Sequence, residues 1–204
     1  MLLNYTLLDF KPGVVLNDAE AIHSVVAALF GNSNGARPLW RVDTMRNGKP
    51  QVLLQWIGAV APAWDVLFKM EDGCLTRESF KIKQVEIAPT EGHQFRFRLH
   101  GNNQKAIKLP IAEDVVQRKR VSQAPEIWLE KKAEHAGFQI VSLQNIERDA
   151  PISVHKRKIP FFLSNCIFEG VLQVTDKEKF ENAIAFGVGR GKAFGMGLLS
   201  IARA

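Results

Sequence analysis

The feature that most constrains the fold of this sequence is a glycine-rich segment, residues 187–197, near its C-terminal end. Five of the 15 glycines of the chain lie in this segment, interleaved with Arg190 and Lys192. Glycine has no Cβ, so it adopts left-handed backbone angles and lets another group come close to the main chain. Two fixed cations in such a loop favour an anionic partner, with phosphate the first candidate.

The elements around this segment distinguish it from nucleotide-binding loops. Its first three glycines have the spacing G-x-G-x-G, which is not the dinucleotide fingerprint, and Ala193 stands where a P-loop needs Ser or Thr. Both motifs place their glycines between a strand and a helix, because a helix N-terminus holds the phosphate. Here residues 176–186 have a helical pattern and residues 198–202 the pattern of a strand. The alternative interpretation is a plain connection rich in helix-stopping glycine.

The same segment resembles a known family. Residues 168–172 (FEGVL), an Asp-capped helix and residues 187–200 (GVGRGKAFGMGLLS) are similar to the C-terminus of the CasE family, the CRISPR-associated endoribonucleases of the type I-E Cascade complex. Residues 83–86 and 95–99 resemble the middle of that family, and the resemblance extends from residue 2 to 202. It implies tandem ferredoxin-like domains, cleavage of CRISPR precursor RNA at the base of the repeat hairpin, and assembly with other Cascade subunits.

Composition agrees with a globular protein that binds a polyanion. The 204 residues allow one or two domains, and the net charge is +6. Cys74 and Cys166 lie in short apolar stretches and are interpreted as reduced core residues. The five histidines have no metal-ligand spacing, and no signal peptide or membrane-spanning run is visible. We therefore expect a cytoplasmic protein with no metal, no cofactor and no membrane contact.

The first half has the pattern of one ferredoxin-like unit. The predicted elements are a strand at 2–8, a helix after Asn17 or Asp18, strands at 39–43 and 51–57 around an Asn-Gly turn, a short helix at 62–69 and a strand at 80–88. This β-α-β-β-α-β order is the split-βαβ arrangement.

The second half repeats the order with a different sequence. The predicted elements are a strand at 94–100, a helix at 125–136, strands at 138–146 and 165–174, a helix from 176 and a last strand at 198–202. Along the first of these strands Phe95, Phe97 and Leu99 share one face, with Arg96 and Arg98 on the other. We predict an α+β protein of two tandem ferredoxin-like (βαββαβ) domains, 1–88 and 93–204, joined by residues 89–92.

Basic residues gather in several stretches of the second half. Residues 118–120 are predicted to lie in a polar connection, and residues 155–158 at the tip between two strands. Each run taken alone is also typical of a solvated surface. Together with the glycine-rich segment they predict a groove for an RNA backbone. The candidate RNA-binding residues are Arg96, Arg98, Arg118, Lys119, Arg120, Lys156, Arg157, Lys158, Gly189, Arg190, Gly191 and Lys192.

His23 is the candidate catalytic residue. From the sequence alone, a histidine at the margin of a helix's buried face is more simply a boundary residue without a chemical role. The resemblance changes that interpretation, because CasE-like proteins carry their catalytic histidine on this first helix. RNA supplies its own nucleophile, the 2′-hydroxyl, so a histidine can serve by proton transfer, which contributes about 10²–10⁴ in rate. The expected products carry a 2′,3′-cyclic phosphate and a 5′-hydroxyl.

One residue departs from the family pattern. A tyrosine is expected one helical turn before the histidine, and Glu20 stands there instead. Glu20 shares a helix face with His23 and is a candidate for raising its pKa or orienting its ring, or it completes an N-terminal cap with Asn17. Tyr5, the only tyrosine, is a second candidate for the missing phenol, or it packs in the core. The departure leaves open a non-catalytic RNA-binding scaffold of the same fold. A small-molecule enzyme is disfavoured, because the sequence has no paired carboxylates, metal ligands or nucleophile elbow.

Overall fold

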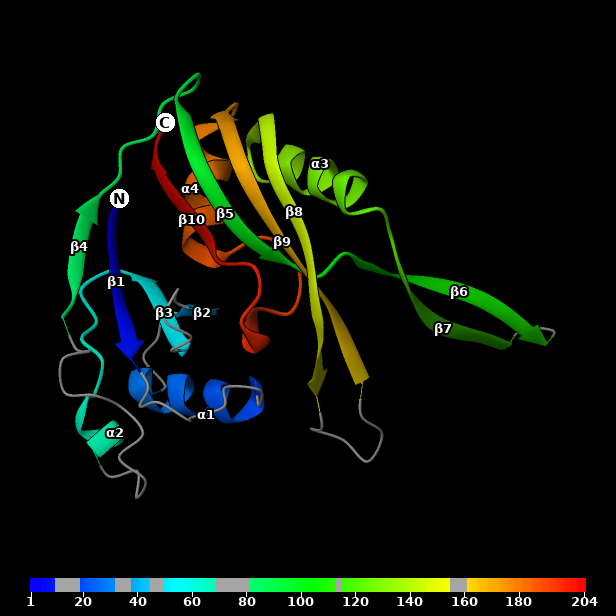
Figure 1. Ribbon diagram of the computed structural model, residues 1–204, viewed down its shortest axis with the longest axis horizontal. Helices are drawn as coiled ribbons and strands as arrows, with labels where there is room; N and C mark the ends of the chain where they lie inside the picture. Colours follow the sequence, from blue (N-terminus) through cyan, green and yellow to red (C-terminus); the bar gives the residue numbers. More distant parts are fainter. Residues whose placement is uncertain (10–18, 32–37, 45–49, 69–80, 113–114, 155–160) are drawn as a thin grey trace.

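The computed structural model describes residues 1–9, 19–31, 38–44, 50–68, 81–112, 115–154 and 161–204. They form two four-stranded antiparallel sheets that lie side by side, and a two-stranded hairpin that projects from the second sheet (Figure 1). In the described parts of the chain, no helix is both long and apolar enough to cross a membrane.

The first sheet has the predicted ferredoxin-like topology. Its strand order is β2-β3-β1-β4, with every pair antiparallel. The elements are β1 (Leu2–Asp9), α1 (Ala19–Phe30), β2 (Leu39–Thr44), β3 (Pro50–Ile57), α2 (Asp65–Phe68) and β4 (Lys83–Glu86). The last helix and strand are shorter than the sequence pattern predicts, and α2 is a single turn.

Helix α1 covers one face of this sheet. Its apolar residues recur at helical spacing, so Ile22, Val26 and Leu29 fall on one side and are buried. They share a core with Leu8 of β1 and Trp56 of β3. The indole of Trp56 also lies edge-on to Phe30, with ring centroids 5.2 Å apart. This packing fixes which side of α1 is left at the surface.

The second sheet repeats the topology, with strand order β10-β5-β9-β8. Helices α3 and α4 cover one face, over a core that includes Phe97, Phe138, Phe168 and Phe180 (Figure 1). The elements are β5 (Gln94–Gly101), α3 (Pro125–His135), β8 (Phe138–Val154), β9 (Phe161–Val174), α4 (Lys177–Phe186) and β10 (Leu199–Arg203). Strands β8 and β9 are longer than predicted, and their far ends extend beyond the sheet toward α1.

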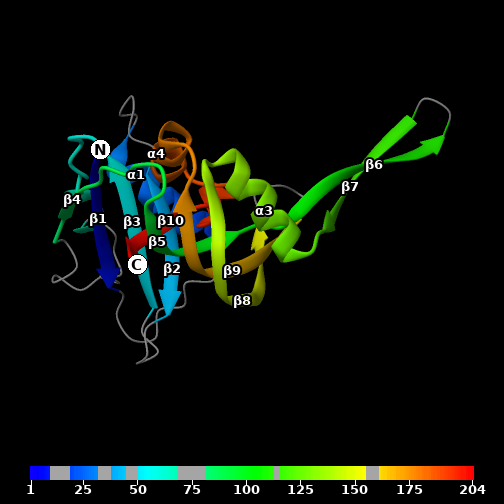
Figure 2. The same ribbon diagram turned by 90° about the horizontal axis from the view of Figure 1, so that it is seen from above.

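The prediction of a polar connection at residues 118–120 is wrong. These residues belong to β7 (Val115–Ser122), which pairs with β6 (Gln104–Ala112) in a hairpin inserted between β5 and α3. The hairpin stands away from the rest of the molecule in two perpendicular views (Figures 1 and 2). Among its described side chains none belongs to an apolar core. Charged side chains are therefore accommodated on both of its faces, and its sequence resembles that of a loop.

The two sheets meet through polar contacts as well as apolar ones. Arg41 of β2 is only 4% exposed and donates through Nη1 to the hydroxyl of Ser200 on β10, at 3.1 Å. Gln55 of β3 donates to the carbonyl of Ile184 in α4 at 3.0 Å. The first sheet therefore lies against the β10 side of the second. Strand β4 ends at Glu86 and β5 begins at Gln94. The division into domains 1–88 and 93–204 stays a prediction.

Candidate functional site

The glycine-rich segment folds as a tight connection between α4 and β10. It contains one short 3-10 turn, η2 (Lys192–Phe194), between Gly191 and Gly195, whose φ angles are 89° and 79°. A Cβ on Gly195 would lie 2.7 Å from Cζ3 of Trp40, and one on Gly191 would lie 2.9 Å from Sδ of Met196. The predicted close approach to the main chain therefore exists, and at these two positions the approaching groups belong to the protein itself.

Three distant parts of the chain meet at η2. Its Phe194 packs against the core under α1, which includes Ile22 and Val26. Ile152 of β8 joins the same core, and Phe161 of β9 lies edge-on to Phe194 at 6.1 Å between ring centroids. Helix α1, the glycine-rich segment and the far ends of β8 and β9 are thus neighbours, as Figure 1 shows.

This junction contains the candidate catalytic histidine. His23 is half-buried on α1, next to Ile22 at the edge of the packed face. Glu20 lies one turn earlier and is also half-buried. In η2, which packs against α1, Lys192 is half-buried, and Arg190 just before it is exposed. The structure therefore brings His23 and the basic glycine-rich segment to the same region. Asn17, the proposed capping partner of Glu20, lies outside the described residues.

Tyr5 does not lie near His23. Strand β1 pairs without irregularity, so its side chains alternate between the two faces of the sheet. Leu8 packs with α1, and Tyr5, an odd number of residues away, faces the other side. There it lies opposite Gln55, which contacts α4, and the Nζ of Lys83 lies 5.6 Å from its ring centroid. The suggestion that Tyr5 replaces the missing tyrosine beside His23 is inconsistent with this placement.

The two arginines of β5 differ in their surroundings. Arg96 is exposed, and its Nε donates to the carbonyl of Arg203. Arg98 is 39% exposed and lies between two carboxylates, at 3.5 Å from Glu169 and 3.7 Å from Asp43. Its charge is therefore balanced inside the protein, at the junction of the two sheets, which disfavours a role in binding phosphate. Arg96 remains at the surface.

His100 lies in the same junction. It is 6% exposed, and its pKa is lowered to about 3, chiefly by burial and then by the charges of Arg41 and Arg98, against the opposing effect of Asp43. A histidine with this pKa is neutral at physiological pH. The face of the second sheet opposite its helices would be a surface in an isolated domain, but here the first sheet covers it at His100.

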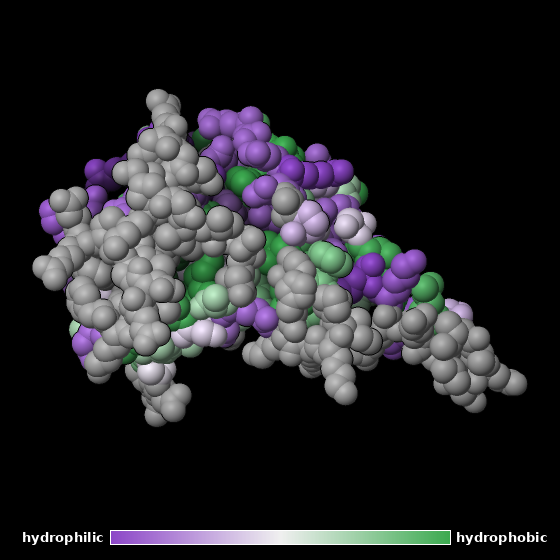
Figure 3. Space-filling model, turned by 60° about the horizontal axis from the view of Figure 1, so that its bottom comes forward, coloured by the Kyte–Doolittle hydropathy of each residue, from purple (hydrophilic) through white to green (hydrophobic). Residues whose placement is uncertain are grey.

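The projecting hairpin carries more cations than sequence analysis identified. Lys119 and Arg120 are exposed on β7, and Arg120 lies over the ring of Phe161 at 5.1 Å. Lys105 and Lys108 of β6 are exposed as well and were missed, because the segment was not recognised as a strand. Figure 3 shows hydrophilic side chains beside hydrophobic ones along this arm. The apolar–charged–apolar alternation of Ile107, Lys108 and Leu109 was the available signal. The side chain of Arg118 and the tip residues Lys156, Arg157 and Lys158 lie outside the described part.

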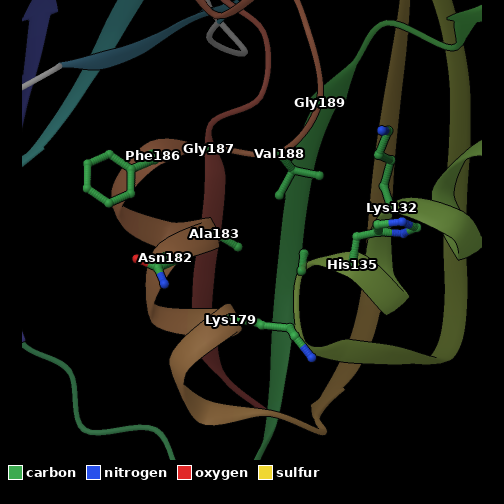
Figure 4. A pocket seen from close by; sticks show the side chains of 10 residues that line it. Lys132, His135, Lys179, Asn182, Ala183, Phe186, Gly187, Val188 and Gly189 are labelled. Carbon is green, nitrogen blue, oxygen red and sulfur yellow. The ribbon is translucent and has the colours of Figure 1, made fainter.

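A separate hollow of about 400 Å³ lies between α3 and α4 (Figure 4). Lys132 and His135 line it from α3, and Lys179 lines it from α4. Lys179 forms an ion pair with Asp176 at 2.7 Å, and the hydrogen bond in this pair raises the pKa of Lys179. Gly189 borders the hollow, and a Cβ there would meet Trp128 at 2.9 Å. The ion pair with Asp176 offsets the charge of Lys179, one of the two lysines that line this hollow.

Known proteins are similar to this chain over most of its length. A family model described as CRISPR associated protein matches residues 9–203. The CRISPR-associated endoribonuclease Cse3 of Thermus thermophilus is 31% identical over 177 residues, which are 81% of this chain and 80% of Cse3. Thermus thermophilus Cse3 bound to an RNA representing a pre-cleavage complex has a TM-score of 0.79 at 27% identity, covering 99% of this chain and all of Cse3. Cas6e from Escherichia coli K-12 shares the fold, with a TM-score of 0.72 at 23% identity over both full chains.

Proposed function

Because this chain belongs to the CasE family of CRISPR-associated proteins, we propose that it is an endoribonuclease that cleaves CRISPR precursor RNA at the base of the repeat hairpin. The observation that carries the proposal is the 31% identity to Cse3 over four fifths of both chains. The match to the RNA-bound form of Cse3 over nearly the whole chain supports it. After cleavage the protein stays on the mature guide RNA, in the cytoplasm, as one subunit of Cascade.

The proposed chemistry uses His23 and no metal ion. The 2′-hydroxyl of the RNA attacks the adjacent phosphorus, the bond to the 5′-oxygen breaks, and the products carry a 2′,3′-cyclic phosphate and a 5′-hydroxyl. His23 moves a proton in this step, since imidazole titrates near neutral pH. The packing of α1 against η2 also supports a role for the glycine-rich segment, in which Lys192 or Arg190 stabilises the negative charge on the pentavalent phosphorus group.

The proposed RNA surface is the basic hairpin together with the basic stretch at residues 156–158. Exposed cations at Lys105, Lys108, Lys119 and Arg120 offer contacts to phosphates. A-form RNA has a deep and narrow major groove, so its stem is recognised mainly through backbone and shape. Arg96 remains a candidate contact on the open face of the second sheet.

A second candidate function is an RNA-binding scaffold without catalysis. The observation that favours it is Glu20, which stands where the family has a tyrosine, while Tyr5 lies on the other face of the sheet from α1. Both functions use the same fold and the same partners, which are the RNA hairpin and the other Cascade subunits. They differ only in whether the bound RNA is cut.

One experiment separates these functions and tests the chemistry. The protein is incubated with its repeat RNA in excess EDTA, and the ends of the products are determined. We expect a single cut with a cyclic phosphate end, and no cut when the nucleotide just upstream carries a 2′-deoxy sugar. Tight binding of the intact RNA without any cut would establish the scaffold. Cleavage of the deoxy substrate, or a requirement for magnesium, would show a hydrolytic nuclease instead.

A further inference from the structure

Phe162 is the most exposed of the large apolar side chains in the part of the chain that the structure describes, at 56%. It is the second residue of β9, at the end of the strand that extends beyond the second sheet (Figure 1). A single exposed phenylalanine is ordinary on a protein surface, so exposure alone indicates no function. The neighbours of the ring decide whether it has one.

The backbone at Phe162 is fixed by the residues on either side of it. The ring of Phe161 packs edge-on to Phe194 of η2, with 6.1 Å between ring centroids, and Leu163 is buried in a small core with Met196. Strand β9 pairs regularly with β8 over these three residues, so Phe162 points to the opposite face from both neighbours. Its ring is presented to solvent from an anchored strand, which lowers the entropy that is lost when a ligand packs on it.

The face of β9 that carries Phe162 leads to the base of the β6–β7 hairpin. Ser164, two residues farther along, is on the same face, and its hydroxyl donates to the side-chain oxygen of Asn103, just before β6. The amide of Asn103 donates in turn to the carbonyl of Gln123, just after β7. The exposed ring and the root of the basic hairpin are therefore parts of one surface.

Cations accompany the aromatic ring. The guanidinium of Arg120, on β7, lies 5.1 Å from the ring centroid of Phe161, the residue before Phe162. Lys119 and, on β6, Lys105 are exposed on the same hairpin. Sites for unpaired nucleic acid combine these two components, because bases stack on aromatic rings while cations follow the phosphates.

The surroundings favour a nucleobase over another protein as the ligand of this ring. A docking surface for a protein has a contiguous apolar core. Beside Phe162 the chain instead has serines, since Ser164 shares its face and Ser153 is its partner in the ladder. A single ring among polar residues offers an area suited to one base, and every base has a face that can stack on it.

We propose that Phe162 is a stacking platform for one unpaired base of the repeat RNA, next to the stem that the basic hairpin contacts. The proposal rests on the proposed function, which supplies the RNA. Stacking tolerates any base, so Phe162 contributes affinity and positions the strand that leaves the stem, but it does not select the sequence.

The test uses repeat RNAs in which each unpaired nucleotide in turn is replaced by an abasic one, which keeps the phosphate and removes the base. At one position we expect wild-type protein to lose at least about 5-fold in affinity, the lower end for a base stacked on an aromatic side chain. Phe162→Ala should bind intact RNA more weakly by a similar factor, and should not distinguish it from that abasic RNA. Its salt dependence should equal that of wild type, because a phenyl ring neutralises no phosphate.

Three further variants serve as controls. Phe162→Trp keeps a planar ring and should retain the 5-fold difference, as should Phe186→Ala, which removes an exposed phenylalanine of α4. Phe162→Leu keeps an apolar side chain without a planar ring, so it should behave as Phe162→Ala does. If Phe162→Leu binds RNA as well as wild type, the ring does not stack and the proposal is wrong. Thermal melting of each variant confirms that it is folded, as expected for changes of an exposed side chain.

The remaining outcomes separate this proposal from the proposed function. If wild-type protein binds and cuts the RNA and Phe162→Ala has the same abasic profile, only the stacking platform fails. If Phe162→Ala binds every RNA as wild type does but no longer assembles with the other Cascade subunits, the ring contacts a protein instead. If wild-type protein neither binds nor cuts the RNA, the proposed function fails with it.

Discussion

A Cβ added to Gly195 would lie 2.7 Å from Cζ3 of Trp40, so the glycine-rich segment is tied to the first sheet by direct contact between main chain and indole. Trp40 is 2% exposed and cannot move aside without disturbing the core under α1. Gly195→Ala should therefore destabilise the protein by about 2–4 kcal/mol, from left-handed strain plus overpacking. Chemical denaturation of the two proteins measures this difference.

Gly92→Ala is the matched control for that change. Gly92 has a φ of +86°, close to the +79° of Gly195, but a Cβ there meets nothing within 4 Å. Its substitution isolates the cost of the backbone angle, roughly 1–2 kcal/mol. Equal losses in the two variants would show that contact with Trp40 contributes nothing to stability.

The sequence predicted the topology of both halves, because apolar periodicity and turn residues are local signals. Ile22, Val26 and Leu29 recur at helical spacing, and Phe97 and Leu99 alternate along β5. The contact between Gly195 and Trp40 was not predictable from these signals. The two residues are far apart in the chain. The sequence also does not distinguish a glycine that is needed for close packing from one that is needed for the approach of a ligand. The basic hairpin was missed because its strands bury no continuous apolar face.

The guanidinium of Arg41 is one of the polar links between the sheets. It donates to Asp43 through Nε and Nη2, at 2.9–3.1 Å, and to Ser200 through Nη1. Arg41→Met should cost about 2 kcal/mol or more of stability, because hydrogen bonds of a buried charge are removed. Arg41→Lys should cost nearly as much, since an ammonium cannot form the planar fork. Arg96→Met, an exposed change, should leave the unfolding midpoint almost unaltered. A lysine variant as stable as wild type would contradict this account of the junction.

His100 predicts a specific pH dependence of stability. Its folded pKa of about 3 lies below the ordinary value of 6.5, so below pH 6.5 the unfolded chain binds a proton that the folded protein does not. The stabilisation is complete above pH 6.5 and is lost as the pH falls toward 3. Between these values His100 should contribute a slope of up to about 1.4 kcal/mol per pH unit. His100→Gln cannot titrate, so its unfolding free energy should fall less steeply from pH 7 to pH 4. Parallel curves for the two proteins would contradict the depressed pKa.

The sequence reached the candidate site only through family resemblance. Nothing in the spacing of His23 distinguishes a catalytic histidine from a boundary residue, and the periodicity of α1 says only that it lies at the edge of the buried face. Its nearness to the glycine-rich segment depends on how the two sheets pack. Strand alternation alone predicts that Tyr5 and Leu8 lie on opposite faces of the sheet. It does not say which face α1 covers, so the separation of Tyr5 from His23 became clear only from the structure.

His23→Ala tests the proposed catalytic residue. We expect cleavage of the repeat RNA to fall at least 100-fold, because proton transfer by a positioned side chain contributes about 10²–10⁴ in rate. Affinity for the hairpin should stay within a few-fold, since this contribution is made in the transition state and not in binding. Single-turnover cleavage and a binding titration measure the two quantities separately. Full cleavage by the variant would show that His23 is not the catalytic residue, whether or not the proposed RNA surface is correct.

Glu20→Gln distinguishes the two interpretations of that residue. If Glu20 acts on His23, removal of its charge should lower the pKa seen in the pH profile of cleavage, because a neighbouring carboxylate favours the imidazolium. If Glu20 serves only as part of a helix cap, glutamine can replace it and the profile should not move. The midpoint of the acid limb of single-turnover rates against pH decides between these outcomes.

The hairpin and the basic stretch at residues 156–158 should both bind RNA phosphates, and salt dependence measures their shares. For a duplex, the slope of log affinity against log salt falls by roughly 0.9 for each phosphate that the protein no longer neutralises. Changing Lys105, Lys108 and Lys119 to Ala should therefore weaken hairpin binding and flatten its salt dependence. The triple change of Lys156, Arg157 and Lys158 to Ala should do the same. The change of Lys105, Lys108 and Lys119 should not alter thermal stability much, because exposed charges contribute little to folding. A set whose removal leaves the slope unchanged is a solvated surface, and the RNA then follows the other set.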